Sequence, residues 1–174
     1  MARSRKETII KDEIKVLNIM EQHARESVGE IAKRCGLSYQ KVSRIIKRLE
    51  ENKIIWGCSA IADGTSRELK HFVLLVKRNT VPFDAAFRKE VTLENLDDYR
   101  PGLVKIENIF FTHGMFNAVI TFNAPNLIGA KNFVQELFKR IGKYLGEYLL
   151  LETLFPIRKQ GLKNPQINKL VEYL

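Results

Sequence analysis

The hydrophobic residues follow two different periods on either side of a polar stretch at residues 61–68. From Ile10 to Asn52 they recur at the three- and four-residue spacing of amphipathic helices. From Phe72 onward, short runs of β-branched and aromatic residues alternate with helical patterns. The stretch between the two parts contains Gly64 and has the composition of a linker. We therefore predict an α-helical N-terminal domain followed by an α+β domain.

The domain boundaries follow from this change of period. We place the first domain at residues 1–62, the linker at 63–70, the second domain at 71–160 and a C-terminal tail at 161–174. With 29 Lys and Arg against 20 Asp and Glu, the chain has a net charge of +9, which favours a polyanionic partner such as nucleic acid. The sequence has no apolar run of the roughly 18 residues that a membrane helix needs, and its start lacks the apolar segment of a secretory signal. We expect a cytoplasmic protein.

Three helices are predicted in the first domain, at residues 10–22, 28–35 and 39–52. Ser27 and Glu30 form a capping-box pattern at the start of the second helix, and Ser38 is a suitable N-cap for the third. Gly36 lies in the short turn between them, where a left-handed backbone is needed. The residues expected to pack the two helices closely against each other are Ile31, Ala32, Cys35, Leu37, Val42 and Ile45. This pattern predicts a helix-turn-helix motif.

The face of the third helix opposite its apolar stripe is basic and polar. Gln and Arg side chains bond base edges in the major groove, whereas Lys and Ser suit phosphates. No acidic residue occurs from Tyr39 through Leu49. A basic face of this kind is often only solvated, but its combination with the turn pattern favours DNA binding. The candidate DNA-binding residues are Ser38, Tyr39, Gln40, Lys41, Ser43, Arg44, Lys47 and Arg48.

Two flanking segments extend this prediction. The apolar run Ile54–Ile61 predicts a strand or other wing segment that closes a winged helix. Upstream, Arg3, Arg5 and Lys6 are typical either of an arm that lies along the DNA backbone or in a minor groove, or of a disordered tail. The first domain is therefore predicted to be a winged helix-turn-helix with a basic N-terminal arm.

The second domain is predicted to have the element order βαββαβ. The strands fall at residues 72–77, 105–112, 116–122 and 149–155, and the helices at 83–96 and 127–141, with a break at Pro101-Gly102. This order predicts a four-stranded antiparallel sheet with both helices on one face, a ferredoxin-like sandwich. The other face would show Leu149, Leu151 and Phe155 or their neighbours, which favours a homodimer. A dimer would present two recognition helices about 34 Å apart, one turn of DNA.

Together, these features resemble the Lrp/AsnC family, the leucine-responsive and asparagine-regulator transcription factors of bacteria and archaea. Similar residues carry the resemblance at matching positions, namely Asp12–Met20, Arg25, Ile31-Ala32, Gly36–Ser38, Val42, Arg44-Ile45, Leu49-Glu50, Ile54-Ile55 and Gly57. The resemblance is strong over residues 10–63 and weaker over 72–160. It implies a sequence-specific, DNA-binding transcriptional regulator that acts as a homodimer or assembles further to an octamer.

Members of this family often bind a small, amino-acid-like effector in the second domain. The matching signature is a glycine-x-aromatic-aspartate run on the hairpin between the second and third strands. Here the run is Gly114, Met115, Phe116 and Asn117, so an amide replaces the aspartate. A neutral amide cannot give an ammonium group the charge-assisted hydrogen bond that a carboxylate gives. The alternative is that these residues only form a tight, packed hairpin.

Two other functions compete with a specific regulator. A nucleoid-type architectural protein would bind DNA with little sequence preference, although Gln40 and Arg44 favour base reading. Siroheme decarboxylases share the two-domain plan, and His113 would be the residue to serve haem-type carboxylates, but the histidine-containing hairpin pattern of those enzymes is absent. Neither the histidines nor Cys35 and Cys58 have metal-ligand spacing. We expect no enzyme activity, no metal and no cofactor.

Overall fold

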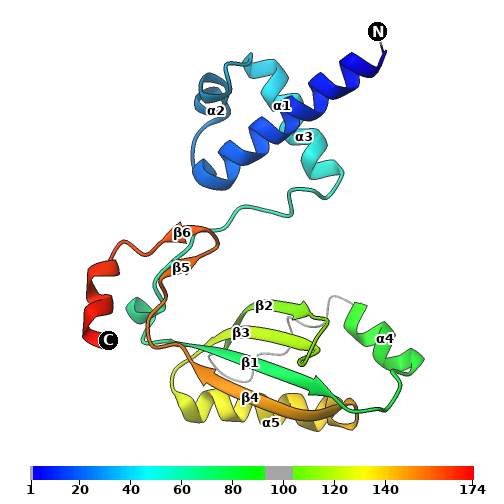
Figure 1. Cartoon of the computed structure of the whole chain (residues 1–174), viewed down its shortest axis with the longest axis vertical. Coiled ribbons are helices and arrows are strands. Elements are labelled where there is room, and N and C mark those ends of the chain that lie inside the picture. Colours follow the sequence, from blue (N-terminus) through cyan, green and yellow to red (C-terminus); the bar gives the residue numbers. More distant parts are fainter. Residues whose placement is uncertain (1, 93–103) are drawn as a thin grey trace. The chain divides into compact units, whose positions relative to one another are not determined.

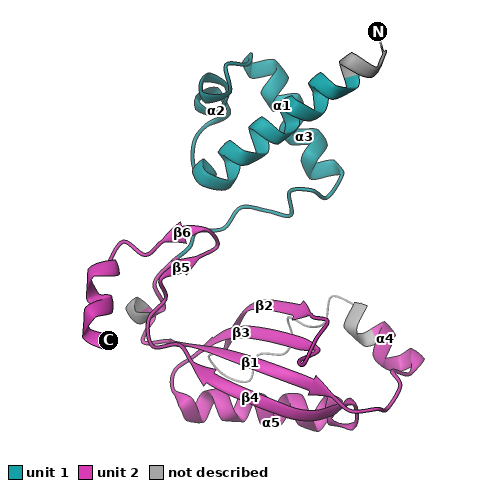
Figure 2. Cartoon of the chain, viewed as in Figure 1, with its two compact units in different colours: residues 1–61 teal, residues 62–174 magenta. Residues whose placement is uncertain are grey.

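The computed structural model describes residues 2–92 and 104–174 of the chain. The chain divides into two compact units, residues 1–61 and residues 62–174 (Figure 2). Among the described residues, no helix is both long enough and apolar enough to span a membrane. Each unit is built around its own apolar core.

The first unit is a bundle of three helices, α1 (Ala2–His23), α2 (Val28–Cys35) and α3 (Tyr39–Glu51) (Figure 1). Its core consists of Val16, Ile31, Ala32, Cys35, Val42, Ile45 and Leu49. Burial raises the pKa of the Cys35 thiol, so this side chain remains protonated and packs as a small apolar group. The predicted helix-turn-helix is confirmed, with α2 and α3 placed as the sequence indicates.

Capping hydrogen bonds and a left-handed glycine define the ends of the helices in the motif. Ser27 and Glu30 form the predicted capping box at the start of α2, and the Ser38 hydroxyl accepts a hydrogen bond from the Lys41 N–H at the start of α3. Gly36 follows α2 in the left-handed conformation, with φ of 59°, and the Leu37 N–H donates to the Ala32 carbonyl at 3.0 Å. A glycine can adopt this conformation without steric cost.

Replacing Gly36 by alanine is expected to lower the free energy of unfolding of the first unit by about 1 kcal/mol. No heavy atom lies within 4 Å of the added Cβ, so the cost arises from the left-handed backbone alone. Gly29→Ala is the matched control: it lies within α2, where its Cβ meets only ordinary contacts, and it should raise stability by about 0.5–1 kcal/mol. Thermal unfolding of both variants measures the difference, and equal effects would contradict this account.

The segments that flank the motif differ from the prediction. Helix α1 begins at Ala2, so residues 3–6 belong to a helix and do not form a separate arm. The segment 54–61 has no strand. A strand needs a partner for its backbone groups, and within the described chain none pairs with this run. Residues 3–6 are therefore helical and the run at 54–61 forms no strand, whereas the three-helix bundle is confirmed.

The second unit contains a four-stranded antiparallel sheet in the order β2-β3-β1-β4. Its main elements follow the chain as β1 (Lys70–Arg78), α4 (Ala85–Thr92), β2 (Lys105–Phe111), β3 (Ala118–Ala124), α5 (Leu127–Ile141) and β4 (Leu145–Glu152). Short 3₁₀ helices lie at η1 (Gly64–Arg67) and η3 (Gly142–Tyr144), and the chain ends in the small hairpin β5 (Arg158–Lys159) and β6 (Leu162–Lys163) and in η4 (Ile167–Tyr173). The element order and strand order confirm the predicted ferredoxin-like α+β fold.

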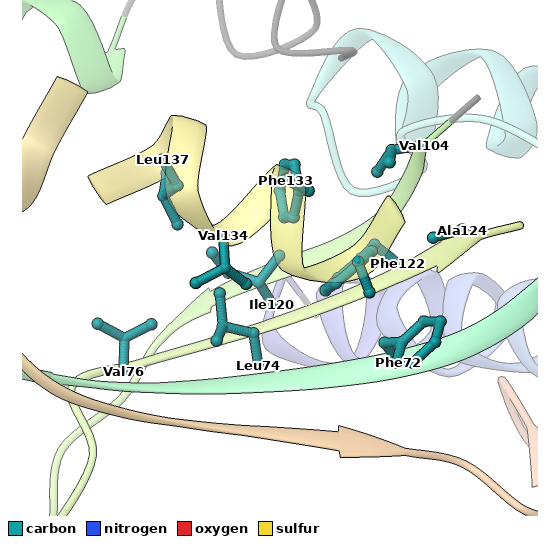
Figure 3. Packing of buried hydrophobic residues seen from close by; sticks show 11 residues of the cluster. Phe72, Leu74, Val76, Val104, Ile120, Phe122, Ala124, Phe133, Val134 and Leu137 are labelled. Atoms are coloured by element: carbon teal, nitrogen blue, oxygen red, sulfur yellow. The ribbon is translucent and has the colours of Figure 1, made fainter. Parts of the chain in front are cut away.

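Helix α5 covers one face of this sheet. Alternate residues of the two central strands point toward it, and Phe72 and Leu74 of β1 and Phe122 of β3 are fully buried there (Figure 3). On the helix, the Phe133 ring packs against the Phe122 ring in a tilted arrangement, with the two ring centroids 4.6 Å apart. The strand residues face α5 at every second position because strand side chains alternate between the two faces.

Helix α4 packs differently from the prediction that both helices cover the sheet. Phe87 of α4 contacts Phe83 and Tyr144 near the end of α5, with ring centroids 4.4 and 4.5 Å away. Asp84 precedes the helix, accepts a hydrogen bond from the Phe87 N–H and pairs with Lys143. These contacts attach the start of α4 beside η3. The rest of the predicted helix, residues 93–96, and the break at 101–102 lie outside the described residues.

The opposite face of the sheet is open and apolar at its centre. Leu75 of β1 pairs with Val119 on one side and with Leu149 on the other, and Val73 pairs with Leu151. Leu149 and Leu151 are each 50% exposed. We call the apolar centre formed by Val73, Leu75, Phe110, Val119, Leu149 and Leu151 the open sheet face. Phe155 was predicted to share this face, but β4 ends at Glu152 and the Phe155 ring instead contacts Tyr173 of η4 at 5.5 Å.

One end of the open sheet face is polar. His71 Nδ1 lies 2.7 Å from the Thr153 hydroxyl, and its Nε2 lies 3.3 Å from Glu107. Glu107 also accepts a hydrogen bond from Asn123 and contacts Lys159 of β5. Partial burial lowers the pKa of His71 below its ordinary value, which favours the neutral imidazole at physiological pH. This cluster ties the C-terminal hairpin to the sheet.

Candidate nucleic-acid interface

Helix α3 buries one face and exposes the other. Val42, Ile45 and Leu49 are at most 4% exposed and pack on α1 and α2. The outward positions include Tyr39, which is 60% exposed, and Lys47, whose side chain is 77% exposed. A short exposed helix that follows a tight turn and carries polar residues is suited to insertion into the DNA major groove.

The side chains best placed to read bases lie one turn apart on this outward face. Gln40 and Arg44 are both exposed, and the Arg44 Nε donates a hydrogen bond to the Gln40 carbonyl at 3.1 Å. This bond fixes the Arg44 side chain along the helix and leaves its terminal nitrogens as donors. Such a fork can bond both acceptors of a guanine edge.

Two of the predicted DNA-binding cations are paired within the domain. Lys41 Nζ lies 2.5 Å from Asp12 Oδ2, and Arg48 Nε lies 2.6 Å from Glu13 Oε1. Lys47 has only a long contact of 3.8 Å with Glu51, and both side chains are largely exposed. Sequence reasoning missed Asp12 and Glu13 because they lie on α1, outside the acid-free window of the third helix. The only available signal was two adjacent carboxylates on a neighbouring helix.

The candidate effector hairpin is held together by its own backbone and side chains. Thr112 donates from its N–H to the Asn117 carbonyl and from its hydroxyl to the Phe116 carbonyl. Gly114 has φ of 142°, a backbone conformation suited to glycine, and Met115 is 77% exposed. The turn therefore has the tight geometry expected of a hairpin.

Asn117 attaches this hairpin to the central strand β1. Its side-chain Oδ1 accepts a hydrogen bond from the Arg78 N–H at 2.8 Å, and its own N–H donates to the Val76 carbonyl at 2.8 Å. The Asn117 side-chain oxygen therefore already accepts a hydrogen bond from the backbone. An aspartate could make the same contact and would add a negative charge.

The histidines are not brought together. His71 lies at the polar end of the open sheet face, whereas His113 lies exposed in the turn after β2, toward the other end of the sheet. His23 belongs to the first unit, beside Glu26. Within residues 2–92 and 104–174, no group of three or more His, Cys, Asp or Glu side chains is placed to hold a metal ion.

Comparison with known proteins agrees with this geometry. Residues 13–55 match the family of winged helix-turn-helix DNA-binding domains. No curated protein sequence matches the chain.

Solved structures share the fold of almost the whole chain. An AsnC family transcriptional regulator from Agrobacterium tumefaciens has a TM-score of 0.66 at 17% identity, covering 89% of this chain and 96% of its own. A transcriptional regulator from Neisseria meningitidis in complex with L-methionine has a TM-score of 0.65 at 17% identity, covering 91% and 97%. A feast or famine regulatory protein from M. tuberculosis, complexed with L-methionine, has a TM-score of 0.65 at 18% identity, covering 89% and 98%. Residues 13–55 therefore form a helix-turn-helix of the DNA-binding kind, in a chain that shares the fold of Lrp/AsnC transcriptional regulators.

Proposed function

We propose that this protein is a sequence-specific DNA-binding transcriptional regulator, not an enzyme. The observation that carries the proposal is the outward face of α3, where Gln40 and Arg44 are exposed above a well-formed helix-turn-helix. Ser38, Tyr39, Ser43 and Lys47 surround these two residues and complete the proposed DNA surface. The match of residues 13–55 to a DNA-binding family supports the same function.

The regulator is proposed to act as a homodimer that forms through the open sheet face. Leu149, Leu151 and Phe110 are each at least half exposed on this face. An apolar surface of this kind is unfavourable in water and is stabilised by association. A second copy of the same chain is the natural partner, because a two-fold axis brings the same apolar rows together and gives a pair of recognition helices for two half-sites.

Genome-wide selection of DNA fragments by the purified protein tests this function. A salt concentration of about 150 mM suppresses purely electrostatic binding. We expect a shared palindromic motif with half-sites about 10 base pairs apart. Recovery of fragments without a shared motif would instead support an architectural DNA-binding protein, and recovery of no fragments would overturn the proposal.

We further propose that the hairpin at residues 114–117 binds an amino-acid-like effector. Two proteins of the same fold were solved with L-methionine, and Met115 is exposed at the tip of this hairpin. Asn117 gives such a ligand a neutral hydrogen-bonding group, so its ammonium group meets no opposite charge from this side chain.

The variant Asn117→Asp is expected to strengthen binding of L-methionine by about fivefold, because the carboxylate forms an ion pair with the ligand's ammonium group that contributes about 1 kcal/mol. The carboxylate retains an oxygen for the Arg78 N–H, so the hairpin should remain folded. Isothermal titration of both proteins with L-methionine measures the change. Asn117→Ala is the control that removes both the hairpin contact and the ligand contact. Unchanged affinity in Asn117→Asp would place any effector elsewhere.

A further inference from the structure

Two ion pairs connect α1 to opposite ends of α3. Asp12 and Glu13 are adjacent on α1, whereas their partners Lys41 and Arg48 are seven residues apart on α3. Seven residues correspond to about 10.5 Å along a helix axis. Val42 and Ile45 lie between Lys41 and Arg48 in the sequence of α3 and are buried in the same core as Val16 of α1.

This arrangement restricts the orientation of α3. Interlocking apolar side chains favour certain crossing angles but scatter by about 15–20° around them, so polar contacts can narrow the range further. The Lys41–Asp12 ion pair and the charge-assisted hydrogen bond from Arg48 to Glu13 contact α3 at separate points along its length. They resist both rotation and sliding of α3 on α1, and so set the angle at which the outward face of α3 is presented.

The carboxylates need these cations for a second reason. The side chains of Asp12 and Glu13 are only 16% and 23% exposed, and a charge withdrawn from water is costly without a partner. They also lie beside a surface proposed to meet phosphates. An unpaired carboxylate at that place would repel DNA, whereas a paired one is largely neutralised.

Lys47 offers an internal comparison on the same helix. Its side chain is 77% exposed and lies 3.8 Å from Glu51, which is 63% exposed. An exposed pair of this length contributes little, so the Lys47 ammonium group is available to a phosphate. Lys41 and Arg48 differ because each has a close partner that is mostly withdrawn from water.

We propose that Asp12 and Glu13 are positioning residues of the DNA-binding helix, which they hold through Lys41 and Arg48, and that these two cations do not contact phosphates. The inference rests on the proposed DNA-binding function. It assigns phosphate contact to Lys47 and leaves base contact to Gln40 and Arg44.

The dependence of DNA affinity on salt concentration tests the assignment. Each phosphate contact adds about 0.9 to the slope of log affinity against log salt. The probe is a duplex with the motif selected by the wild-type protein. Lys47→Met should reduce the slope by about 0.9. The double variant Asp12→Asn/Lys41→Met removes the whole pair without changing the net charge. It should leave the slope unchanged and weaken binding about fivefold. A reduction of about 0.9 in the double variant would overturn the proposal.

Exchange of the paired charges provides a second test. Relative to the neutral double variant, positioning and phosphate contact predict opposite changes in DNA affinity for the exchanged variants. Asp12→Lys/Lys41→Asp and Glu13→Arg/Arg48→Glu retain the ion pairs but place a carboxylate on α3. If the pairs act by positioning, each exchanged variant should bind within about twofold of wild type, and better than either of its single variants. If Lys41 or Arg48 contacts phosphate, exchange should weaken binding more than the neutral double variant does.

Thermal unfolding shows which variants are folded before their affinities are compared. Should an exchanged pair fail to fold, the slopes of Asp12→Asn/Lys41→Met, Glu13→Gln/Arg48→Met and Lys47→Met decide the question, because the first two variants leave no carboxylate unpaired. Unchanged slopes in the first two and a reduced slope in the third support the positioning role, whereas three equal reductions contradict it. Failure of the proposed function is a separate result, because the wild-type protein would then select no DNA at all.

Discussion

Replacement of Leu149 and Leu151 by aspartate is expected to convert the proposed dimer to a monomer. Both side chains are 50% exposed at neighbouring outward positions of β4, an edge strand of the sheet. In a dimer these positions would be buried, and an unpaired charge buried at an interface costs several kcal/mol. Sedimentation equilibrium should give a mass near the chain mass of 20.1 kDa for the double variant and twice that for the wild-type protein.

Loss of the dimer should also weaken binding to a two-half-site DNA by about 100-fold or more, because the second recognition helix no longer benefits from a high effective concentration. Ile128→Asp is the matched control. Ile128 is 70% exposed on α5, the helix that covers the other face of the sheet, so this variant should remain dimeric. A double variant that still sediments as a dimer would show that the subunits associate through another surface.

The helix-turn-helix could be predicted from the sequence because its signals are local. The capping box of Ser27 and Glu30, the left-handed Gly36 and the cap at Ser38 each act within a few residues, and the structure contains all of them. The order of strands and helices in the second unit could be predicted for a similar reason. Each element has its own hydrophobic period, and the range of α5 agrees at both ends.

Features that depend on distant partners were not predictable. The run at 54–61 has the apolar composition of a strand, but composition does not supply a pairing partner, and the segment is irregular. Phe155 continues the apolar alternation of β4, yet it packs on Tyr173 of η4. Asn117 resembles a ligand residue in sequence, whereas the structure shows that its oxygen accepts from the Arg78 N–H of another strand.

The candidate DNA surface shows the same division between local and distant information. The helical period correctly separates the buried residues of α3 from Gln40, Arg44 and Lys47. It cannot show that Lys41 and Arg48 are paired, because their partners belong to α1. A count of basic residues on one helix therefore overestimates the positive charge that DNA would meet.

Replacement of Arg44 by alanine is expected to weaken binding to the selected motif by about 1–3 kcal/mol and to relax the preference at one base pair of each half-site. Arg44 is exposed, and its Nε donates to the Gln40 carbonyl, which directs its remaining donors away from the core. A bidentate bond to guanine distinguishes this base from the other three. Affinity measured against a set of duplexes with single base changes would show loss of discrimination at that position only.

Arg44→Lys separates the shape of the guanidinium group from its charge. Lysine keeps the positive charge but lacks the planar fork of donors. If Arg44 reads a base, the lysine variant should lose discrimination nearly as fully as the alanine variant, while its salt dependence stays close to that of the wild-type protein. If Arg44 only contacts phosphate, lysine should restore most of the affinity and every duplex should be affected alike, which would contradict base reading by this residue. The comparison also distinguishes a sequence-specific regulator from an architectural protein. An architectural protein has no base preference, so Arg44→Ala would change its affinity for all duplexes alike.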